Sequence, residues 1–341
     1  MEIGNIVGTE KKLFIPDSAA NESIIVTGAP GYGKTDAVKK ISKEIAKSGH
    51  NVLVCNYHST HNDILYDKEA YHVISAKRDG IPVPFLERFT YPDGSREDAE
   101  DIAEAVAEVF SQVGKMGYAA KYQMIQAVQQ AVKMRDGYGD DMTCLLAAVM
   151  MEEEKNEVLL AKYKNLMMRV KFLKKYDLWR KGMVTVIDFS GCPSAVQISL
   201  TQLILSAIWR RYQIFGQTQQ EKTFLVLDEF QNLPFKNGSI LSQILREGRK
   251  FKLFLLLATQ TIYTYDTESR IVLQQPGTKL YFRPVDTEIK RIAKSFTDIE
   301  AKMAENLLKG LGIGECLATG EFEIAGTSRM RTLKVTFREK E

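Results

Sequence analysis

Short runs of apolar residues alternate along the chain with stretches in which apolar residues recur every three or four positions. Residues 24–26 form such a run, and beyond a glycine-rich stretch Val38, Ile41 and Ile45 follow at helical spacing. Residues 51–55 form the next apolar run. A strand, a helix and a strand in this order predict a right-handed β-α-β unit of a buried parallel sheet.

The pattern is helical from residue 95 to about residue 179. Two apolar stripes run through this segment, namely Ile102, Val106, Val109, Phe110 and Val113, and then Leu159, Tyr163, Leu166, Val170 and Leu173. Apolar residues at this spacing are typical of a packed core rather than of a ligand site. We therefore predict an all-helical inserted subdomain at 95–179, within an α/β core formed by residues 1–94 and 180–341.

The sheet pattern resumes after the helical segment. Strands are predicted at 184–188, 224–229 and 253–258, and helices at about 194–215 and 239–249. The glycine-rich stretch 310–314 lacks the context of a phosphate-binding loop, and we interpret it as turns.

Composition narrows the class of protein. With 341 residues, of which 45% are hydrophobic, the chain can bury a sizeable core. A formal net charge of only +3 gives no strong overall field, so any surface for nucleic acid must be local. The four cysteines lack a C-x-x-C pair, which favours a reducing cytosol. Without a secretory signal or an apolar stretch of roughly 20 residues, we expect a cytoplasmic protein with no membrane insertion.

The stretch after the first apolar run has the spacing G-x-x-x-x-G-K-T. Its predicted nucleotide-binding residues are Gly28, Ala29, Pro30, Gly31, Tyr32, Gly33, Lys34 and Thr35. In such a P-loop the backbone N–H groups cradle phosphates, the lysine reaches the β- and γ-phosphates, and the hydroxyl ligates Mg²⁺. The strand before it and the helix after it supply the required context. We therefore expect ATP and Mg²⁺ as cofactors; the alternative is an ordinary glycine-rich turn.

Two later strands end in Asp, and either carboxylate could belong to the Mg²⁺ shell. Asp228 is followed by Glu229, and a carboxylate one residue beyond the metal ligand can polarise the attacking water. We assign Asp228 to the metal, together with Thr35, and Glu229 to the base. Asp188 is interpreted as a cap of the following turn. Gln260, at the end of a strand predicted beside the P-loop, is placed to touch the γ-phosphate or its water; alternatively it is a polar strand end.

The segments GAPGYGKT, VLDEF and LREGRKFKLFLLLATQ occur together with a helical insertion. This combination resembles the HerA/FtsK superfamily of P-loop ATPases, and looks closest to its HerA-like and TraG-type conjugative coupling-protein branches. The resemblance runs from about residue 22 to the C-terminus, and its most specific part is GRK before a buried strand ending in T-Q. It implies a P-loop NTPase fold of the RecA/ASCE-like type, an α/β architecture with a mostly parallel sheet flanked by helices.

In that family the motor is a hexameric ring that pumps DNA through its pore, and an arginine of the next subunit completes each site. The resemblance assigns this role to Arg249, with Arg246 in reserve, and makes Gln260 the sensor glutamine. Either arginine could instead form a surface salt bridge. Asn56 stands where HerA-like proteins usually carry Asp, and the segment before the P-loop is too short for the β-barrel of many HerA proteins. We expect the ring to be held together by the motor itself or by a partner.

The motifs together predict an ATP-hydrolysing, hexameric DNA translocase with a helicase-like motor. The alternative is a nucleotide-dependent, ring-forming assembly or regulatory subunit that presents a partner such as a nuclease or relaxase, in a mobile-element or defence system. The modest net charge keeps this alternative open. A small-molecule kinase ranks below both. Cys55, His58 and His61 are spaced by three residues, but no fourth ligand lies nearby in the sequence, which disfavours a metal site there.

Overall fold

The computed structural model describes residues 1–56, 67–324 and 326–338. Its strands are β1 (Glu2–Ile6), β2 (Lys12–Phe14), β3 (Ile24–Thr27), β4 (Asn51–Asn56), β5 (Tyr71–Ser75), β6 (Val184–Asp188), β7 (Thr223–Leu227), β8 (Leu253–Thr259), β9 (Thr278–Phe282), β10 (Glu315–Ile324) and β11 (Thr327–Thr336). Its α-helices are α1 (Lys34–Lys47), α2 (Ala99–Gly114), α3 (Tyr118–Met134), α4 (Asp141–Met150), α5 (Glu157–Met167), α6 (Ser194–Phe215), α7 (Ile240–Glu247), α8 (Thr267–Val272), α9 (Asp286–Ala293) and α10 (Ala301–Lys309).

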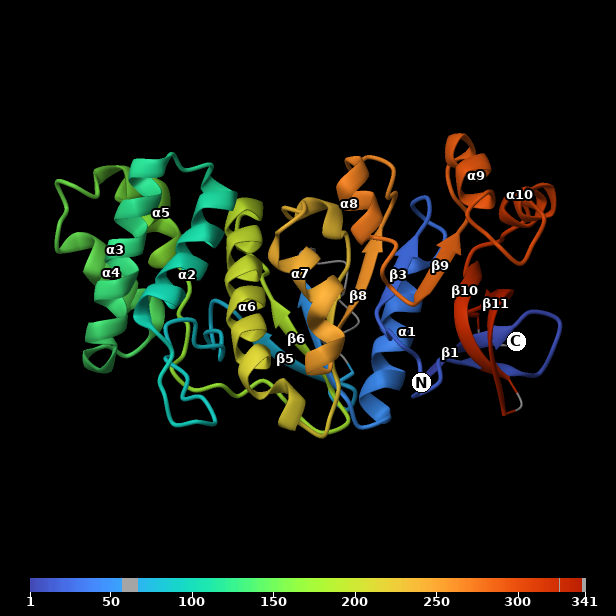
Figure 1. Cartoon of the computed structure of the whole chain (residues 1–341), viewed down its shortest axis with the longest axis horizontal. Coiled ribbons are helices and arrows are strands. Elements are labelled where there is room, and N and C mark those ends of the chain that lie inside the picture. Colours follow the sequence, from blue (N-terminus) through green and yellow to red (C-terminus); the bar gives the residue numbers. More distant parts are fainter. Residues whose placement is uncertain (57–66, 325, 339–341) are drawn as a thin grey trace.

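All of these strands belong to one mixed sheet in the order β11-β1-β2-β10-β9-β3-β8-β7-β4-β6-β5. The stretch from β9 to β5 is parallel, and β10 joins β9 in the antiparallel sense. The predicted α/β fold with a mostly parallel sheet is thus confirmed. Strand β8 lies between β3 and β7 and is parallel to both, so the carboxyl ends of the three strands meet at one edge of the sheet. Figure 1 shows β3 and β8 running in the same direction.

The apolar runs of the central strands are buried on both faces of the sheet. Leu255 and Leu257 belong to the core that α6 and α7 cover, whereas Leu256 and Ala258 belong to the core on the side of α1. Successive side chains of a strand point to opposite faces, so a strand covered on both sides has to be apolar at every position. This is why the sequence shows continuous runs here rather than alternation.

The helices α2 to α5 all fall within the segment predicted to be helical, and they lie at the far end of the molecule beyond α6 (Figure 1). The first four residues of the first stripe are buried, namely Ile102, Val106, Val109 and Phe110. The second stripe is only partly helical, because α5 ends at Met167, and the prediction of a helix up to residue 179 is wrong. Phe172 instead forms a short bridge with Ile81. One apolar core is continuous from these helices to the sheet, so the domain division stays a prediction.

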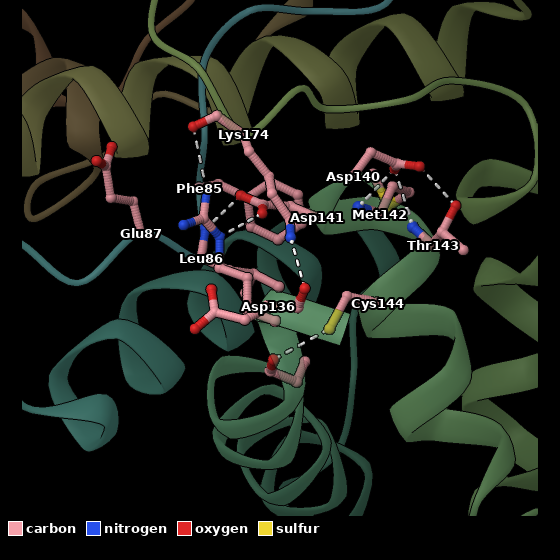
Figure 2. Close-up of polar contacts among 12 residues, drawn as sticks. Phe85, Leu86, Glu87, Asp136, Asp140, Asp141, Met142, Thr143, Cys144 and Lys174 are labelled. Carbon is pink, nitrogen blue, oxygen red and sulfur yellow. Dashed lines mark hydrogen bonds and ion pairs between the residues drawn. The ribbon is translucent and has the colours of Figure 1, made fainter. Parts of the chain in front are cut away.

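Buried polar contacts tie α4 to the segment that precedes the helical region. The Asp141 carboxylate is fully buried; it accepts a hydrogen bond from the Leu86 N–H at 2.9 Å and pairs with Nε of Arg135 at 2.6 Å. Arg135 also donates to the Lys174 carbonyl at 3.4 Å. Asp140 caps α4 by accepting from the N–H groups of residues 142 and 143 (Figure 2). The segments that carry Leu86, Arg135 and Asp141 therefore meet at the Asp141 carboxylate.

We expect Asp141→Ala to lower the free energy of unfolding by about 3–5 kcal/mol, because it leaves the Arg135 guanidinium and a buried N–H without their partner. Urea or thermal unfolding measures this. Asp140→Ala is the matched control and should cost about 1 kcal/mol, the usual value of a helix N-cap. The double variant Asp141→Leu with Arg135→Met should recover much of the loss. Equal losses of unfolding free energy for Asp141→Ala and Asp140→Ala would contradict the role assigned to the buried contacts of Asp141.

Candidate functional site

The P-loop joins β3 to α1 at the edge of the sheet where the parallel strands end. Gly28 has φ 150°, and a Cβ there would lie 2.7 Å from the Cβ of Phe282. Gly33 has φ 89° and is the N-cap of α1, so no side chain caps the first N–H groups of this 14-residue helix. Those N–H groups and the helix dipole favour an anion in front of the loop.

The Lys34 side chain lies along the loop. Its Nζ donates to the Ala29 carbonyl at 2.9 Å, and only 6% of the residue is exposed. Burial lowers the pKa of the Lys34 amine, and the charges of Glu229 and Asp228 act in the opposite direction. The buried ammonium group thus has the predicted base, Glu229, and the predicted metal ligand, Asp228, as its electrostatic neighbours.

The hydroxyl of Thr35 donates to Oδ2 of Asp228 at 2.8 Å. Asp228 directly follows β7, while Thr35 lies in the first turn of α1, so this contact joins residues 193 positions apart. A hydroxyl and a carboxylate are oxygen ligands of the kind that Mg²⁺ prefers. The pair that the sequence assigned to the metal is therefore brought together, and its chemistry fits that ion.

Glu229 lies beside this pair in a left-handed backbone conformation, with φ 53°. Such a conformation costs a non-glycine residue about 1 kcal/mol or more and is enriched at functional sites. The Oε2 atom of Glu229 accepts hydrogen bonds from Gln231 and, at 3.4 Å, from Gln260 at the end of β8. Gln260 thus reaches the predicted base. The contact of Gln231 was not predicted; its only sequence signal is a position two residues beyond Glu229.

Two further strands, β6 and β4, end in the polar residues Asp188 and Asn56. Oδ1 of Asp188 accepts from the N–H and the hydroxyl of Ser190, which bears out its interpretation as a turn cap. Asn56, which ends β4 next to β6, is 8% exposed, and its Oδ1 has no hydrogen-bond partner within the described residues. Burial raises the pKa of the Cys55 thiol to about 12. His58 and His61 lie outside the described residues.

The predicted arginines lie at the opposite edge of the sheet. Arg249 belongs to a short 3₁₀ helix, Gly248–Phe251, which precedes β8, whereas the P-loop and Gln260 are at the other end of the same strands. A seven-residue strand such as β8 spans roughly 20 Å. Arg246 and Arg249 are exposed, line a hollow of about 320 Å³, and form no ion pair with any described residue. One chain therefore does not bring either arginine to its own P-loop.

One contact with the P-loop was missed by the sequence analysis. The N–H of Gly314 donates to the Tyr32 carbonyl at 2.9 Å, and the Arg283 guanidinium lies 5.7 Å from the centre of the Tyr32 ring. The stretch 310–314 does form turns, as predicted. Its spacing gave no signal that these turns dock on the phosphate-binding loop.

Comparison with known proteins identifies the family of the chain. Residues 1–211 match the family model described as the central domain of helicase HerA. A probable helicase of Methanocaldococcus jannaschii, MJ1565, is 21% identical over 94% of this chain and 64% of its own length, so the chain spans less than two thirds of that relative.

Solved structures share the fold over nearly the whole chain. VirB4 of Thermoanaerobacter pseudethanolicus superimposes with a TM-score of 0.71 at 15% identity, over 100% of this chain and 96% of that one. The plasmid coupling protein TrwB in complex with ADP and Mg²⁺ has a TM-score of 0.62 at 11% identity, over 99% and 94%. No helix of the described residues is long and apolar enough to span a bilayer. The family model covers more than half of the sequence, and the chain belongs to the HerA helicase central-domain family of P-loop ATPases.

Proposed function

We propose that this chain is the ATP-hydrolysing subunit of a ring-shaped motor that moves DNA. The observation that carries the proposal is the hydrogen bond between Thr35 and Asp228, with Glu229 and Gln260 beside it. Residues from β7, β8 and the P-loop converge there as a hydrolytic site requires. Membership of the HerA family and the shared fold with TrwB support the same conclusion.

The loop and its lysine bind the triphosphate in this proposal. The backbone N–H groups of residues 31–35 and the Lys34 amine contact the β- and γ-phosphates. The Lys34 amine then exchanges the Ala29 carbonyl for phosphate oxygens, which also compensate its buried charge. Thr35 and Asp228 would hold Mg²⁺, which when bound neutralises charge on the phosphate oxygens.

Glu229 is the general base. Its carboxylate takes the proton of a water molecule while the water oxygen bonds to the γ-phosphorus and the bond from that phosphorus to the bridging oxygen breaks. Gln260 contacts the same carboxylate from the end of β8, so a change in the protonation of Glu229 changes a hydrogen bond to that strand. This contact offers a path by which hydrolysis moves β8 and the elements that follow it.

A neighbouring subunit completes the site with an arginine. Arg249 lies about one strand length from the P-loop of its own chain and has no carboxylate partner among the described residues, so it is available at the surface. In a closed ring of head-to-tail subunits, one edge of each sheet can face the opposite edge of the next. We assign Arg249 to that contact, with Arg246 as the reserve.

Duplex DNA should stimulate the ATPase, and the stimulation should fall steeply as the salt concentration increases. The reason is that each phosphate contact adds about −0.9 to the slope of the logarithm of the DNA-binding constant against the logarithm of the salt concentration. Steady-state ATPase assays at several salt concentrations test this, with Lys34→Ala as the inactive control. Native mass measurement with an ATP analogue should show a hexamer. No stimulation by any nucleic acid, together with a tightly bound protein partner, would favour the assembly or regulatory subunit instead.

A further inference from the structure

The turn before β10, at residues 313–314, contacts the P-loop. The N–H of Gly314 donates to the Tyr32 carbonyl at 2.9 Å. The contact is close, since a Cβ at Gly33 would lie 3.0 Å from the nitrogen and 3.1 Å from the Cα of Gly314. Two glycines that are 281 positions apart thus allow two backbones to touch, with φ 89° at Gly33 and φ 74° at Gly314.

The turn itself is firmly anchored. The Gly314 carbonyl accepts from the N–H of Phe337 at 2.9 Å, immediately beyond β11. Glu315 accepts from the Gly312 N–H at 2.8 Å and pairs with Lys334 of β11 at 2.8 Å. The hairpin of β10 and β11 is in turn part of the main sheet through β9. The donor that reaches the P-loop is therefore held by the sheet and not by a free loop.

The hydrogen bond sets the direction of a phosphate-binding group. The Tyr32 carbonyl and the Gly33 N–H belong to one planar peptide unit, in which a trans peptide makes the two bonds point in opposite directions. Because the Tyr32 carbonyl points to Gly314, the Gly33 N–H points away from that turn, and the backbone N–H groups of a P-loop are the groups that cradle phosphate.

We propose that Gly314 is a positioning residue for nucleotide binding, which orients the Gly33 N–H through the Tyr32 carbonyl. The inference rests on the proposed binding of a triphosphate at this loop. The hydrolytic groups lie on the other side, because Asp228 and Gln260 follow β7 and β8, whereas the turn reaches the loop from the side of β9 and β10. Loss of the contact should therefore act on phosphate binding and not on the chemical step.

The test replaces Gly314 by residues that differ in their tolerance of a positive φ. Valine is β-branched and strongly disfavoured there, whereas Asn is enriched in this conformation. Gly314→Val in the full-length chain should weaken binding of ATP and of inorganic tripolyphosphate alike, by roughly tenfold to a hundredfold, the worth of one hydrogen bond to a charged group. Gly314→Asn should bind both nearly as tightly as the wild type. Calorimetric titration with Mg²⁺ present measures the Kd values.

Gly8→Val is the matched control for backbone strain, since Gly8 has φ 77° and a Cβ added there would meet no atom within 4 Å. It should lower the Tm but leave triphosphate affinity unchanged. In ATPase assays Gly314→Val should raise KM and leave kcat nearly intact. If Gly314→Val does not fold, Gly314→Ala should show a smaller loss in the same direction.

Two outcomes would overturn the inference. One of them leaves the proposed function standing, and the other overturns it as well. If the wild type binds triphosphate and Gly314→Val binds it as tightly as Gly8→Val, the positioning role is wrong and the proposed function stands. If the wild type binds neither ATP nor tripolyphosphate, both proposals fail together.

Discussion

Replacing Glu229 by Gln should leave ATP binding intact and slow hydrolysis by about 10²–10⁴-fold, the usual contribution of a general base. The change removes the basic carboxylate but keeps the shape of the side chain. The phosphate-binding groups, Lys34 and the P-loop, are untouched, so the Kd for ATP should stay near the wild-type value. Single-turnover hydrolysis and equilibrium nucleotide binding measure the two effects separately.

Two further variants make this result specific. Glu247→Gln changes an exposed glutamate at the end of α7, on the far edge of the sheet, and should retain full activity. Gln231→Ala removes one donor to the Glu229 carboxylate without removing the carboxylate. It should reduce the rate less than Glu229→Gln does. Full ATPase activity in Glu229→Gln would show that the base has been assigned to the wrong residue.

The sequence predicts those parts of the site that depend on the succession of neighbouring residues and elements along the chain. The P-loop needs a strand, eight residues of fixed spacing and a helix, and the structure has all three. The positions of Asp228, Glu229 and Gln260 just beyond β7 and β8 could be predicted because buried parallel strands are continuous apolar runs whose ends are easily seen. Their placement at one edge follows from the parallel arrangement, which brings Asp228 to Thr35.

Other features depend on packing that no local pattern records. Strand β5 was missed because only Tyr71 and Ile74 of its five residues are buried, so it has no continuous apolar run. The apolar residues after Met167 continue the helical spacing by coincidence, and Phe172 pairs with Ile81 of a distant segment instead. The docking of Gly314 on the P-loop likewise joins segments that the antiparallel extension of the sheet brings together.

Replacing Arg249 by Ala should lower kcat of the assembled ring by about 10³-fold, the worth of an arginine supplied in trans to phosphoryl transfer. Each subunit should still bind ATP, because Arg249 lies on the opposite edge of the sheet from its own P-loop. Lys250→Ala is the neighbouring control: its exposed ion pair with Glu247 at 3.5 Å is worth little, so activity should be retained. Arg246→Ala shows whether the reserve residue carries the role instead.

Mixed rings separate a contribution in trans from one in cis. Arg249→Ala and Glu229→Gln subunits are each expected to be inactive alone. When they are co-expressed in equal amounts, about a quarter of the interfaces in a closed head-to-tail ring should join a native Glu229 site to a native Arg249. ATPase activity should then return to about that fraction of the wild-type value, because every such site is complete. If both rings and mixtures form but no activity returns, Arg249 does not act across the subunit interface, and the slow turnover of Arg249→Ala has to arise within its own chain.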